Sequence, residues 1–376
     1  MKLKNTILAA SLLMVNLAFS EIITVALVGG DYNTIHAAVN AASDSQRDTV
    51  MVLSGTYIFT VEQGAITIDK ELALIGSGYD AVEDGGTKIH APGQIFIFTA
   101  SSDESNLAGF RFQGSFDGMV SVSGSDIVIE ENMFQNNSTG YALIIGGSQD
   151  TVRNNIFTNG TAGTANNGLA VYSTADVIVN NNIFASNNWA ITTDLNTDFK
   201  IVNNIFINNS AGGIYNGGYN YYNYEDNPII SGNIFMTCGT GINNRGGTPT
   251  VAYNGFYNNS ANYSGANYEA NTNDPLFVNY DAGDVYNWDS YDEDNYDFHL
   301  QSTSTYIDAG PPEEEWYDVE PGEHGLRNDL GIYGFGWPIG ENGAPTIPVV
   351  NTISVSPSTV SPSGTITIEA TGRIGE

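Results

Sequence analysis

Cysteine is almost missing from this sequence of 376 residues. Its one cysteine, Cys238, excludes a disulfide within the chain, so the fold has to be stabilised by packing and hydrogen bonds. Cys238 stands three residues after Phe235, where comparable stretches of the chain carry Asn. We therefore expect a buried, neutral thiol at this position rather than a nucleophile.

Basic residues are also scarce. The chain has 11 Lys and Arg against 42 Asp and Glu, which gives a formal net charge of -31. Such a charge repels phosphates, so nucleic acid and anionic membranes are disfavoured as partners. An acidic polysaccharide is disfavoured for the same reason, unless cations bridge it to the protein.

Long apolar runs are confined to the start of the chain. Residues 1–20 place Lys2 and Lys4 before an apolar run from Ile7 to Phe19, followed by a cleavage site before Glu21. This pattern is typical of a secretory signal peptide, and the run is too short for a stable membrane span. We expect a protein that is secreted or held at the outer cell surface, with no transmembrane segment.

The sequence does contain a repeated phrase, Asn-Asn-Ile-Phe, at 154–157, 181–184 and 203–206. Looser copies of it occur before and after these three. The copies end in phenylalanines that stand 21 to 29 residues apart: Phe110, Phe134, Phe157, Phe184, Phe206, Phe235 and Phe256. A period in this range indicates stacked structural repeats rather than one globular core.

Each repeat contains three short stretches of alternating apolar residues, separated by turns rich in Asn and Gly. Three strands per coil, each pairing with its equivalent one coil later, form a parallel β-helix. We predict an all-β fold of about nine to ten such rungs, each rising about 4.8 Å. The phenylalanines should stack inside the bore. The Asn two residues before each Phe should form a buried amide ladder and also adopt the positive φ of the bend.

The pattern of two apolar residues, Asn and Phe resembles the repeats of the pectin-lyase-like fold, from about Asp31 to Tyr268. The resemblance implies a right-handed, single-stranded parallel β-helix. It is specific for architecture and not for activity, because this fold hosts lyases, hydrolases and adhesins. The amphipathic stretch from Ile35 to Ala42 predicts a short helix that plugs the N-terminal end, with Asp31 or Asn33 as its N-cap.

The composition divides the chain into a signal peptide (1–20), the β-helix (21–273), a block with a different signature (274–338), a linker (339–350) and a tail (351–376). The phrases D-P-L-F-V-N, D-F-H-L-Q-S and Y-I-D-A-G resemble the C-terminal block of secreted bacterial β-helix surface proteins with varied anchors. That resemblance implies a cap that closes the C-terminal end of the coil. The tail resembles the truncated start of an immunoglobulin-like sandwich or secretion domain.

Aligning the repeats places Tyr172, Asp194 and Asn244 in one outward column, with Arg245 just beyond it. A tyrosine-rich insertion at 217–226 leaves the coil beside this column. Aromatic faces next to a carboxylate and a guanidinium suit a sugar-binding groove. The residues expected to contact a sugar are Tyr172, Tyr215, Tyr221, Tyr224 and Asn244.

Catalysis is the alternative use of the same groove. In a lyase, Arg245 would act as the base or neutralise a uronate, with Tyr219 or Tyr222 as proton donor. In a hydrolase, Asp194 would pair with a carboxylate of the insertion. The catalytic signatures of the polygalacturonases and pectate lyases are missing from the sequence.

Binding of an extracellular polysaccharide or a cell-surface glycan, without an assigned reaction, is therefore the leading hypothesis. A polysaccharide lyase or glycoside hydrolase is the first alternative, and a structural or adhesin module is the second. We expect a monomer.

A calcium site is the one metal centre that the sequence suggests. Asp289, Asp292 and Asp294 lie in an acidic segment, and oxygen ligands at short, irregular spacing suit Ca²⁺. A solvated acidic loop is the alternative interpretation of the same residues.

Two further patterns concern the outer surface of the coil. Glu130 and Arg153 fall at equivalent positions of adjacent repeats and should form a surface ion pair. Apolar residues directly before the phenylalanines should form an outward column that needs a cover: Met133, Ile156, Ile183, Ile205 and Ile234. We expect the C-terminal segment or a loop to cover this column, and a partner surface is the alternative.

Overall fold

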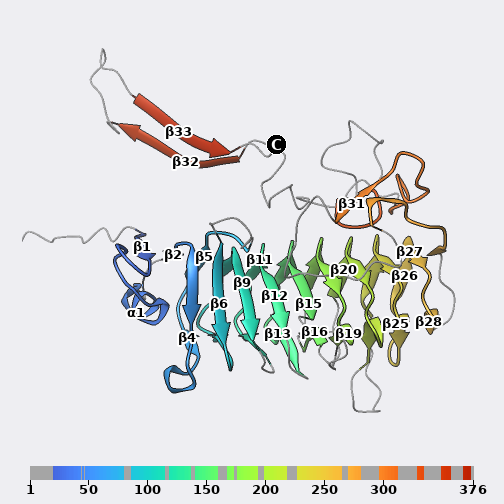
Figure 1. Ribbon diagram of the computed structural model, residues 1–376, viewed down its shortest axis with the longest axis horizontal. Coiled ribbons are helices and arrows are strands. Elements are labelled where there is room, and N and C mark those ends of the chain that lie inside the picture. Colours follow the sequence, from blue (N-terminus) through green and yellow to red (C-terminus); the bar gives the residue numbers. More distant parts are fainter. Residues whose placement is uncertain are drawn as a thin grey trace, which may run out of the picture.

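The protein is a coil of three parallel β-sheets (Figure 1). The computed structural model describes residues 20–43, 45, 47–79, 86–114, 118–136, 140–159, 167–172, 176–193, 199–217, 227–264, 270–280, 296–311, 328–333, 349–356 and 367–373. The three sheets, here called A, B and C, contain ten, ten and nine strands. The predicted all-β parallel helix with three strands per rung is confirmed.

Sheet A precedes the Asn bend of each repeat, and sheet B follows it. Sheet A consists of β1 (Ile22–Val25), β2 (Asp48–Val52), β5 (Leu72–Gly76), β8 (Asn106–Ala108), β11 (Val128–Glu130), β14 (Thr151–Arg153), β17 (Val177–Asn180), β20 (Phe199–Val202), β23 (Ile229–Ser231) and β26 (Thr250–Ala252). Sheet B consists of β3 (Gly55–Ile58), β6 (Thr87–Ala91), β9 (Phe110–Gly114), β12 (Met133–Asn136), β15 (Ile156–Asn159), β18 (Ile183–Ala185), β21 (Ile205–Ile207), β24 (Ile234–Met236), β27 (Asn254–Tyr257) and β29 (Ala270–Asn271).

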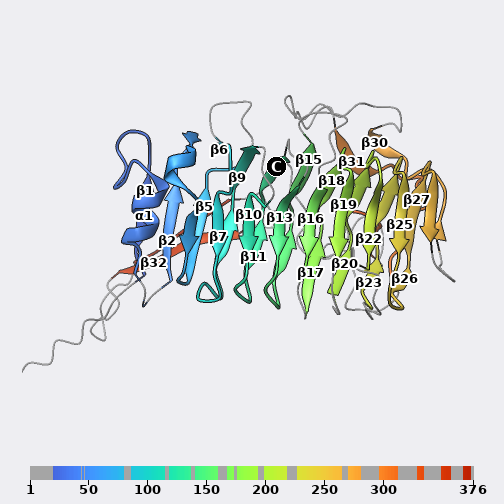
Figure 2. The same cartoon turned by 90° about the horizontal axis from the view of Figure 1, so that it is seen from below.

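Sheet C completes each rung before the chain returns to sheet A, and most of its strands carry labels in Figure 2. It consists of β4 (Ile66–Ile68), β7 (Phe96–Phe98), β10 (Val120–Val122), β13 (Tyr141–Ile145), β16 (Asn167–Val171), β19 (Trp189–Thr193), β22 (Gly212–Asn216), β25 (Thr240–Asn244) and β28 (Ala261–Ser264). A single turn of 3-10 helix, η1 (Val61–Gln63), precedes β4.

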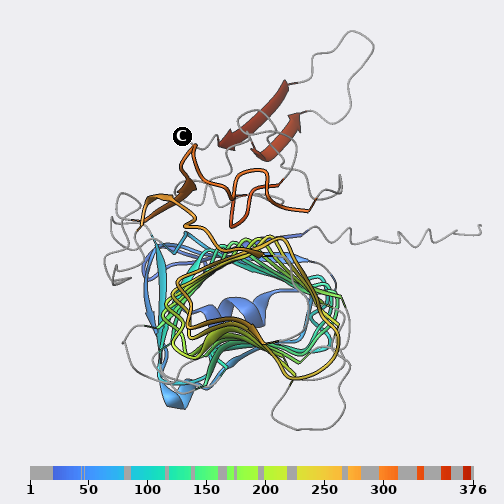
Figure 3. The same ribbon diagram turned by 90° about the vertical axis from the view of Figure 1, so that its right-hand side faces the viewer.

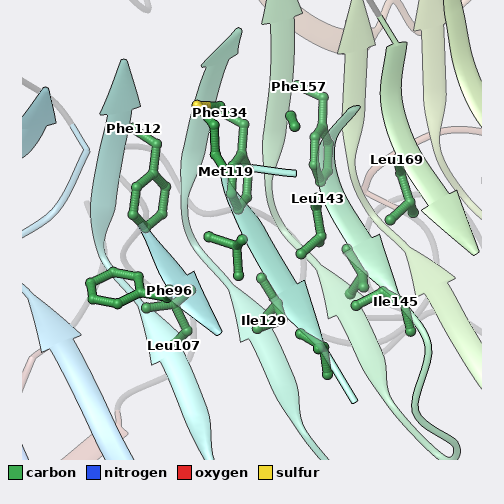
Figure 4. Packing of buried hydrophobic residues seen from close by; sticks show 14 of the residues in the cluster. Phe96, Leu107, Phe112, Met119, Ile129, Phe134, Leu143, Ile145, Phe157 and Leu169 are labelled. Carbon is green, nitrogen blue, oxygen red and sulfur yellow. The ribbon is translucent and has the colours of Figure 1, made fainter. Parts of the chain in front are cut away.

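The strands pair in register, so equivalent residues of successive rungs lie over one another. In sheet B, for example, Phe157 pairs with Phe184, and Phe184 pairs with Phe206. From Phe134 to Phe256 the neighbouring ring centroids are 4.6 to 5.1 Å apart, and their planes agree within 8°. Figure 4 shows the beginning of this stack, with Phe112, Phe134 and Phe157 facing one another inside the coil. The predicted phenylalanine column is confirmed from Phe134 to Phe256. On the preceding rung its member is Phe112 and not the predicted Phe110, because the register pairs Phe112 with Phe134.

The predicted amide ladder is also confirmed. The side-chain oxygen of Asn182 accepts hydrogen bonds from the backbone N–H of Asn155 (2.9 Å) and from its Nδ2 (3.0 Å). Asn182 in turn donates Nδ2 to Asn204 and to the carbonyl of Val152. Every rung of this ladder is fully buried, and its members are Asn132, Asn155, Asn182, Asn204, Asn233 and Asn254.

The positive φ of the bend does not belong to the ladder Asn, which corrects the expectation above. It belongs to the preceding residue, as in Asn154 (55°), Asn181 (55°) and Asn203 (53°). The first Asn of the pair therefore turns the chain, because Asn tolerates the left-handed conformation, and the second satisfies buried carbonyl groups. The doubled Asn reflects two separate physical demands at adjacent positions.

A second, shorter amide ladder follows sheet B. Asn187 and Asn209 are buried and hydrogen-bonded to each other at 3.1 Å. Cys238 occupies the next rung, where Asn209 donates Nδ2 to its Sγ at 3.7 Å. Burial raises the pKa of the Cys238 thiol to about 11. The expected buried, neutral cysteine is confirmed.

The predicted N-terminal helix is α1 (Ile35–Ala41), and it lies across the bore of the coil in Figure 3. Its N-cap is Thr34, whose side chain accepts from the N–H of Ala37, and not Asp31 or Asn33. Asp31 instead accepts from Thr24 across the β1 turn. The described residues contain no helix that is long and apolar enough to cross a membrane.

The outward isoleucine column is covered, as expected, by the C-terminal segment. Phe277, Tyr280, Phe298, Tyr306, Leu330 and Ile332 bury Met133, Ile156, Ile183, Ile205 and Ile234 in a second apolar core. The covering residues include the antiparallel strands β30 (Phe277–Asn279) and β31 (Asp297–Leu300). Figure 3 shows β30 and β31 beside the coil, so the described part of this block covers a lateral face rather than the end of the bore.

The turning asparagines hold this cover in place. Asn181 donates Nδ2 to the carbonyl of Ile332 at 2.7 Å, and Asn203 donates to those of Asp329 and Gly331 at 2.9 and 3.0 Å. Asn328 donates back to Asn203 Oδ1 at 2.8 Å. In two of the three copies, the first Asn of the repeated phrase thus turns the chain and also binds the cover.

A separate antiparallel pair, β32 (Val349–Ser356) and β33 (Thr367–Arg373), lies in the predicted tail. β32 begins two residues inside the stretch predicted as a linker, 339–350. The predicted signal peptide lies, apart from Ser20, outside the described residues. The remaining domain boundaries stay predictions. The predicted ion pair is present, since Arg153 Nη2 lies 2.6 Å from Glu130 Oε2.

Candidate functional site

The outer face of sheet C carries the candidate site. One outward column runs the whole length of the sheet, and the strand register places its nine members directly over one another. None of them is charged: Thr67, Ile97, Ser121, Ile144, Ala170, Thr192, Tyr215, Asn243 and Ser264.

An aromatic pair forms the centre of this face. The rings of Trp189 and Tyr215 come from adjacent strands, β19 and β22, and their centroids are 5.2 Å apart at an interplanar angle of 63°. Both side chains are half-buried, so part of each ring remains exposed to solvent. Such edge-to-face pairs are favourable and hold each ring in a fixed orientation.

A glycine determines how the indole lies. Gly212 pairs with Trp189 across the two strands, and a Cβ added to Gly212 would lie 2.3 Å from Cζ3 of the indole. The six-membered ring of Trp189 therefore rests directly on the backbone of β22. The backbone N–H of Trp189 donates to Asn167 Oδ1 at 3.1 Å. The platform is thus positioned by the sheet itself before any ligand arrives.

Neutral polar groups flank the aromatic pair. Asn243 is next to Tyr215 in the column, and its Oδ1 accepts from Ser264 Oγ at 3.1 Å. Asn188 and Ser210 come shortly before β19 and β22, and Ser210 Oγ donates to Asn188 Oδ1 over a long distance of 3.4 Å. A second aromatic contact joins Tyr141 and Tyr172, whose ring centroids are 6.2 Å apart.

The predicted column of Tyr172, Asp194 and Asn244 is shifted by one residue in the structure. The strand register aligns Val171, Thr193, Asn216 and Asn244, so Tyr172 is equivalent to Arg245 and not to Asn244. Asn244 Oδ1 accepts from the buried Asn216, which in turn accepts from Thr193 Oγ1. Asn244 therefore belongs to a third, short hydrogen-bonded ladder and not to an outward binding column.

Arg245 is exposed at the end of β25. Its Nε donates to Asn243 Oδ1 at 3.3 Å, and its backbone N–H donates to the carbonyl of Asn216. Among the described residues, no carboxylate forms an ion pair with Arg245.

Several predicted residues lie outside the described residues. These are Asp194, Tyr219, Tyr221, Tyr222 and Tyr224 of the predicted groove, and Asp289, Asp292 and Asp294 of the predicted calcium site. Within the described ranges, no group of three or more His, Cys, Asp or Glu side chains is arranged to hold a metal ion.

The carboxyl group of Asp150 has a perturbed pKa without belonging to this face. Burial is the main cause that raises its pKa to about 7, and the nearby Asp126 and Asp103 add to the effect. Its Oδ1 accepts from the backbone N–H of Ile127 at 2.9 Å, one rung away. In the bend before sheet A, Asp150 thus accepts a hydrogen bond from a backbone N–H of the neighbouring rung, as the ladder asparagines do in the bend before sheet B. We interpret Asp150 as a structural residue.

Trp189 is the residue that the sequence analysis missed. It stands at the repeat position that Tyr141, Asn167, Gly212 and Thr240 occupy on other strands of sheet C. Because these residues differ from one another, the position has no consensus from which Trp189 departs. The signal that could have revealed it is the combination of a large ring on one rung with a glycine at the same position of the next.

The match to a protein-family model agrees with the architecture. Residues 73–227 match the family model described as a right handed beta helix region. No curated protein matches the chain. Among solved structures the chain is similar to pectate lyase Pel9A, with 17% identity, 85% of this chain and 98% of that chain covered, and a TM-score of 0.42. It is also similar to a pectin methylesterase from Aspergillus niger, with 15% identity, 68% and 86% covered, and a TM-score of 0.28.

Proposed function

We propose that this right-handed parallel β-helix protein binds extracellular carbohydrate on the outer face of sheet C. The observation that supports the proposal is the platform of Trp189 and Tyr215, held by Gly212 beneath the indole. Sugar rings present apolar C–H faces and a rim of hydroxyl groups. Aromatic rings suit the faces, and amide and hydroxyl groups such as Asn243 and Ser264 suit the rim.

The rest of the surface supports binding rather than a reaction. General acid–base chemistry needs a group whose pKa is tuned toward the working pH, within reach of the substrate. Asp150 is the described carboxyl group with a pKa near neutrality, and its buried position in the bend before sheet A removes it from the face of sheet C. A binding role requires no such group.

We further propose that the protein is secreted or displayed at the outer cell surface as a monomer. The support is the sequence of residues 1–20, with its basic start and apolar run. The ligand would then be an extracellular polysaccharide or a cell-surface glycan.

A polysaccharide lyase or glycoside hydrolase is the second candidate function. The observation that favours it is the exposed guanidinium of Arg245, which occupies the same column as Tyr172 at the edge of the aromatic face. In a lyase, Tyr219 or Tyr222 would be the proton donor beside Arg245. In a hydrolase, Asp194 would instead pair with Glu225 or Asp226. The third candidate is a structural or adhesin module, in which the face of sheet C has no ligand.

One experiment separates these candidates. The purified protein is incubated with a panel of neutral and acidic polysaccharides, and retention is measured together with reducing ends and the absorbance of unsaturated products. Retention without turnover, weakened in Trp189→Ala and unchanged in Ile58→Ala, is the expected result. Ile58 is a suitable control because it is 67% exposed on a different sheet. Turnover that disappears in Arg245→Ala would favour the enzyme instead.

The calcium site at Asp289, Asp292 and Asp294 remains a proposal that supports the same role, since extracellular modules use weak Ca²⁺ sites. The thermal midpoint should rise with added Ca²⁺ in the natural protein and not in a variant with Asp292→Asn and Asp294→Asn. An equal response of both proteins would remove the site.

A further inference from the structure

The outer face of sheet C is electrically neutral over its whole described length, and this property bears on the identity of the ligand. The nine-residue column contains no acid and no base. The strand starts beside it are neutral as well, and these positions are Tyr141, Asn167, Trp189, Gly212, Thr240 and Ala261. A charged ligand would therefore meet no compensating charge in these two columns.

We propose that the carbohydrate bound here is a neutral glycan and not a polyuronate. This inference rests on the proposed function and specifies its substrate class. A polyuronate brings one carboxylate per sugar, and each carboxylate that loses water against a protein surface needs a cation or several hydrogen-bond donors. Among the described residues, Arg245 is the one cation at the edge of this face, and a single guanidinium cannot compensate a carboxylate on every sugar of a bound chain.

Long-range electrostatics act in the same direction. The formal net charge of -31 gives the whole molecule a negative field, which lowers the local concentration of anionic polymers. At physiological salt, charges within a Debye length of about 8 Å still interact, which spans roughly two rungs of the coil. A neutral polymer is not subject to this repulsion.

The aromatic platform provides what a neutral sugar can use. The indole of Trp189 rests on β22 because Gly212 has no Cβ, and Tyr215 stands at 63° to it on the same side of the sheet. Two rings on adjacent strands form a bent surface that accepts an apolar sugar face without any charged contact. Since the rings are already oriented, little conformational entropy is lost on binding.

The test compares neutral probes with anionic probes under two salt conditions. Soluble xylan, β-glucan and galactan serve as neutral probes, and polygalacturonate and alginate serve as anionic probes, each with and without Ca²⁺. Affinity is measured by calorimetry and affinity electrophoresis at about 0.05 M and about 0.5 M salt, a range over which charge–charge attraction is strongly screened. We expect one neutral polymer to bind with an affinity that changes less than about twofold between these salt conditions.

Three variants locate the binding. Trp189→Ala should weaken the neutral polymer about tenfold or more, as expected for an aromatic hot spot. Gly212→Val keeps the indole but displaces it, so it should weaken binding nearly as much. Its Cβ would also lie 2.3 Å from the carbonyl oxygen of Thr240, so this variant is used only if it folds. Trp189→Phe should restore part of the affinity. Ile58→Ala is the control, and circular dichroism with thermal midpoints checks that every variant is folded.

The outcomes separate the inference from the function on which it rests. Binding of polygalacturonate or alginate that weakens with salt or requires Ca²⁺ would overturn the neutral-glycan inference and leave carbohydrate binding intact. Failure of every polymer to bind would overturn both. Neutral binding that is unaffected in folded Trp189→Ala and Gly212→Val would overturn the location on sheet C.

Discussion

Replacing Asn182 with alanine tests the physical basis of the coil. The side chain of Asn182 donates hydrogen bonds to Val152, Asn180 and Asn204, and it accepts from the backbone and the side chain of Asn155. All of these contacts are buried or nearly so. The substitution therefore removes five hydrogen bonds from the middle of a ladder that spans six rungs.

The magnitude follows from which groups lose every partner. Asn204 Oδ1 keeps the backbone N–H of Asn182, and Asn155 Nδ2 keeps the carbonyls of Ile129 and Arg153. The backbone N–H of Asn155 is the group left unsatisfied, since its acceptor is the deleted oxygen. One buried orphan costs about 1–3 kcal/mol, and the other lost bonds raise the expected loss to roughly 3–5 kcal/mol.

Asn188→Ala is the matched control. Asn188 is also an asparagine beside a bend, but it is partly exposed and its hydrogen bonds to Asn167 and Ser210 are both long, at 3.4 Å. Its removal should change the free energy of unfolding by about 0.5 kcal/mol or less. The assay is urea unfolding followed by circular dichroism, with the slope checked because repeat proteins can depart from two-state behaviour. Equal losses in the two variants would refute the claim that the ladder stabilises the coil.

Three further predictions concern other parts of the molecule. Burial raises the pKa of Asp150 in the folded protein to about 7, whereas in the unfolded chain this carboxyl group ionises near pH 4. The free energy of unfolding should therefore fall as the pH rises from about 4 to about 7. Asp150→Asn should remove the corresponding decline in thermal midpoint. Cys238, with its pKa raised to about 11, should resist thiol reagents at pH 8 in the folded protein and react at the rate of unfolding. Ile205→Ala should cost about 2–5 kcal/mol because the cover buries this outward residue completely, whereas Ile144→Ala on sheet C should cost clearly less in the same urea assay, because Ile144 is only half-buried.

The inner columns could be predicted from the sequence because each residue there meets its own equivalent. Phe157 stacks on Phe184, and Asn155 hydrogen-bonds to Asn182. A residue type that recurs in the sequence therefore corresponds to a contact that recurs between rungs. The cover was predictable for a related reason, since a column of outward isoleucines cannot remain in water. Which residues form the cover was not predictable, because their contacts with the coil each occur once.

The predicted binding column was less accurate, and its errors have physical causes. The prediction grouped Asn244 with Tyr172, whereas the strand register aligns Asn244 with Val171. Neighbouring residues of a strand face opposite sides, so a shift of one residue reverses the predicted face. Asn244 was therefore predicted on the surface, whereas its side chain belongs to the hydrogen-bonded ladder. Trp189 escaped notice because no column of identical residues contains it.

Inward and outward residues of this coil therefore carry different kinds of information. An inward residue is determined by its neighbours one rung away, so its identity repeats and its role can be inferred without coordinates. An outward residue meets solvent, a cover or a ligand, and none of these repeats with the rungs. The two asparagines of one phrase show the difference. Asn182 hydrogen-bonds to the equivalent Asn204 of the next rung, whereas its neighbour Asn181 binds Ile332, which stands 151 positions later in the chain. A ligand-binding face in such a fold has to be sought where the outward columns depart from uniformity, and on sheet C that departure is the indole of Trp189 over Gly212.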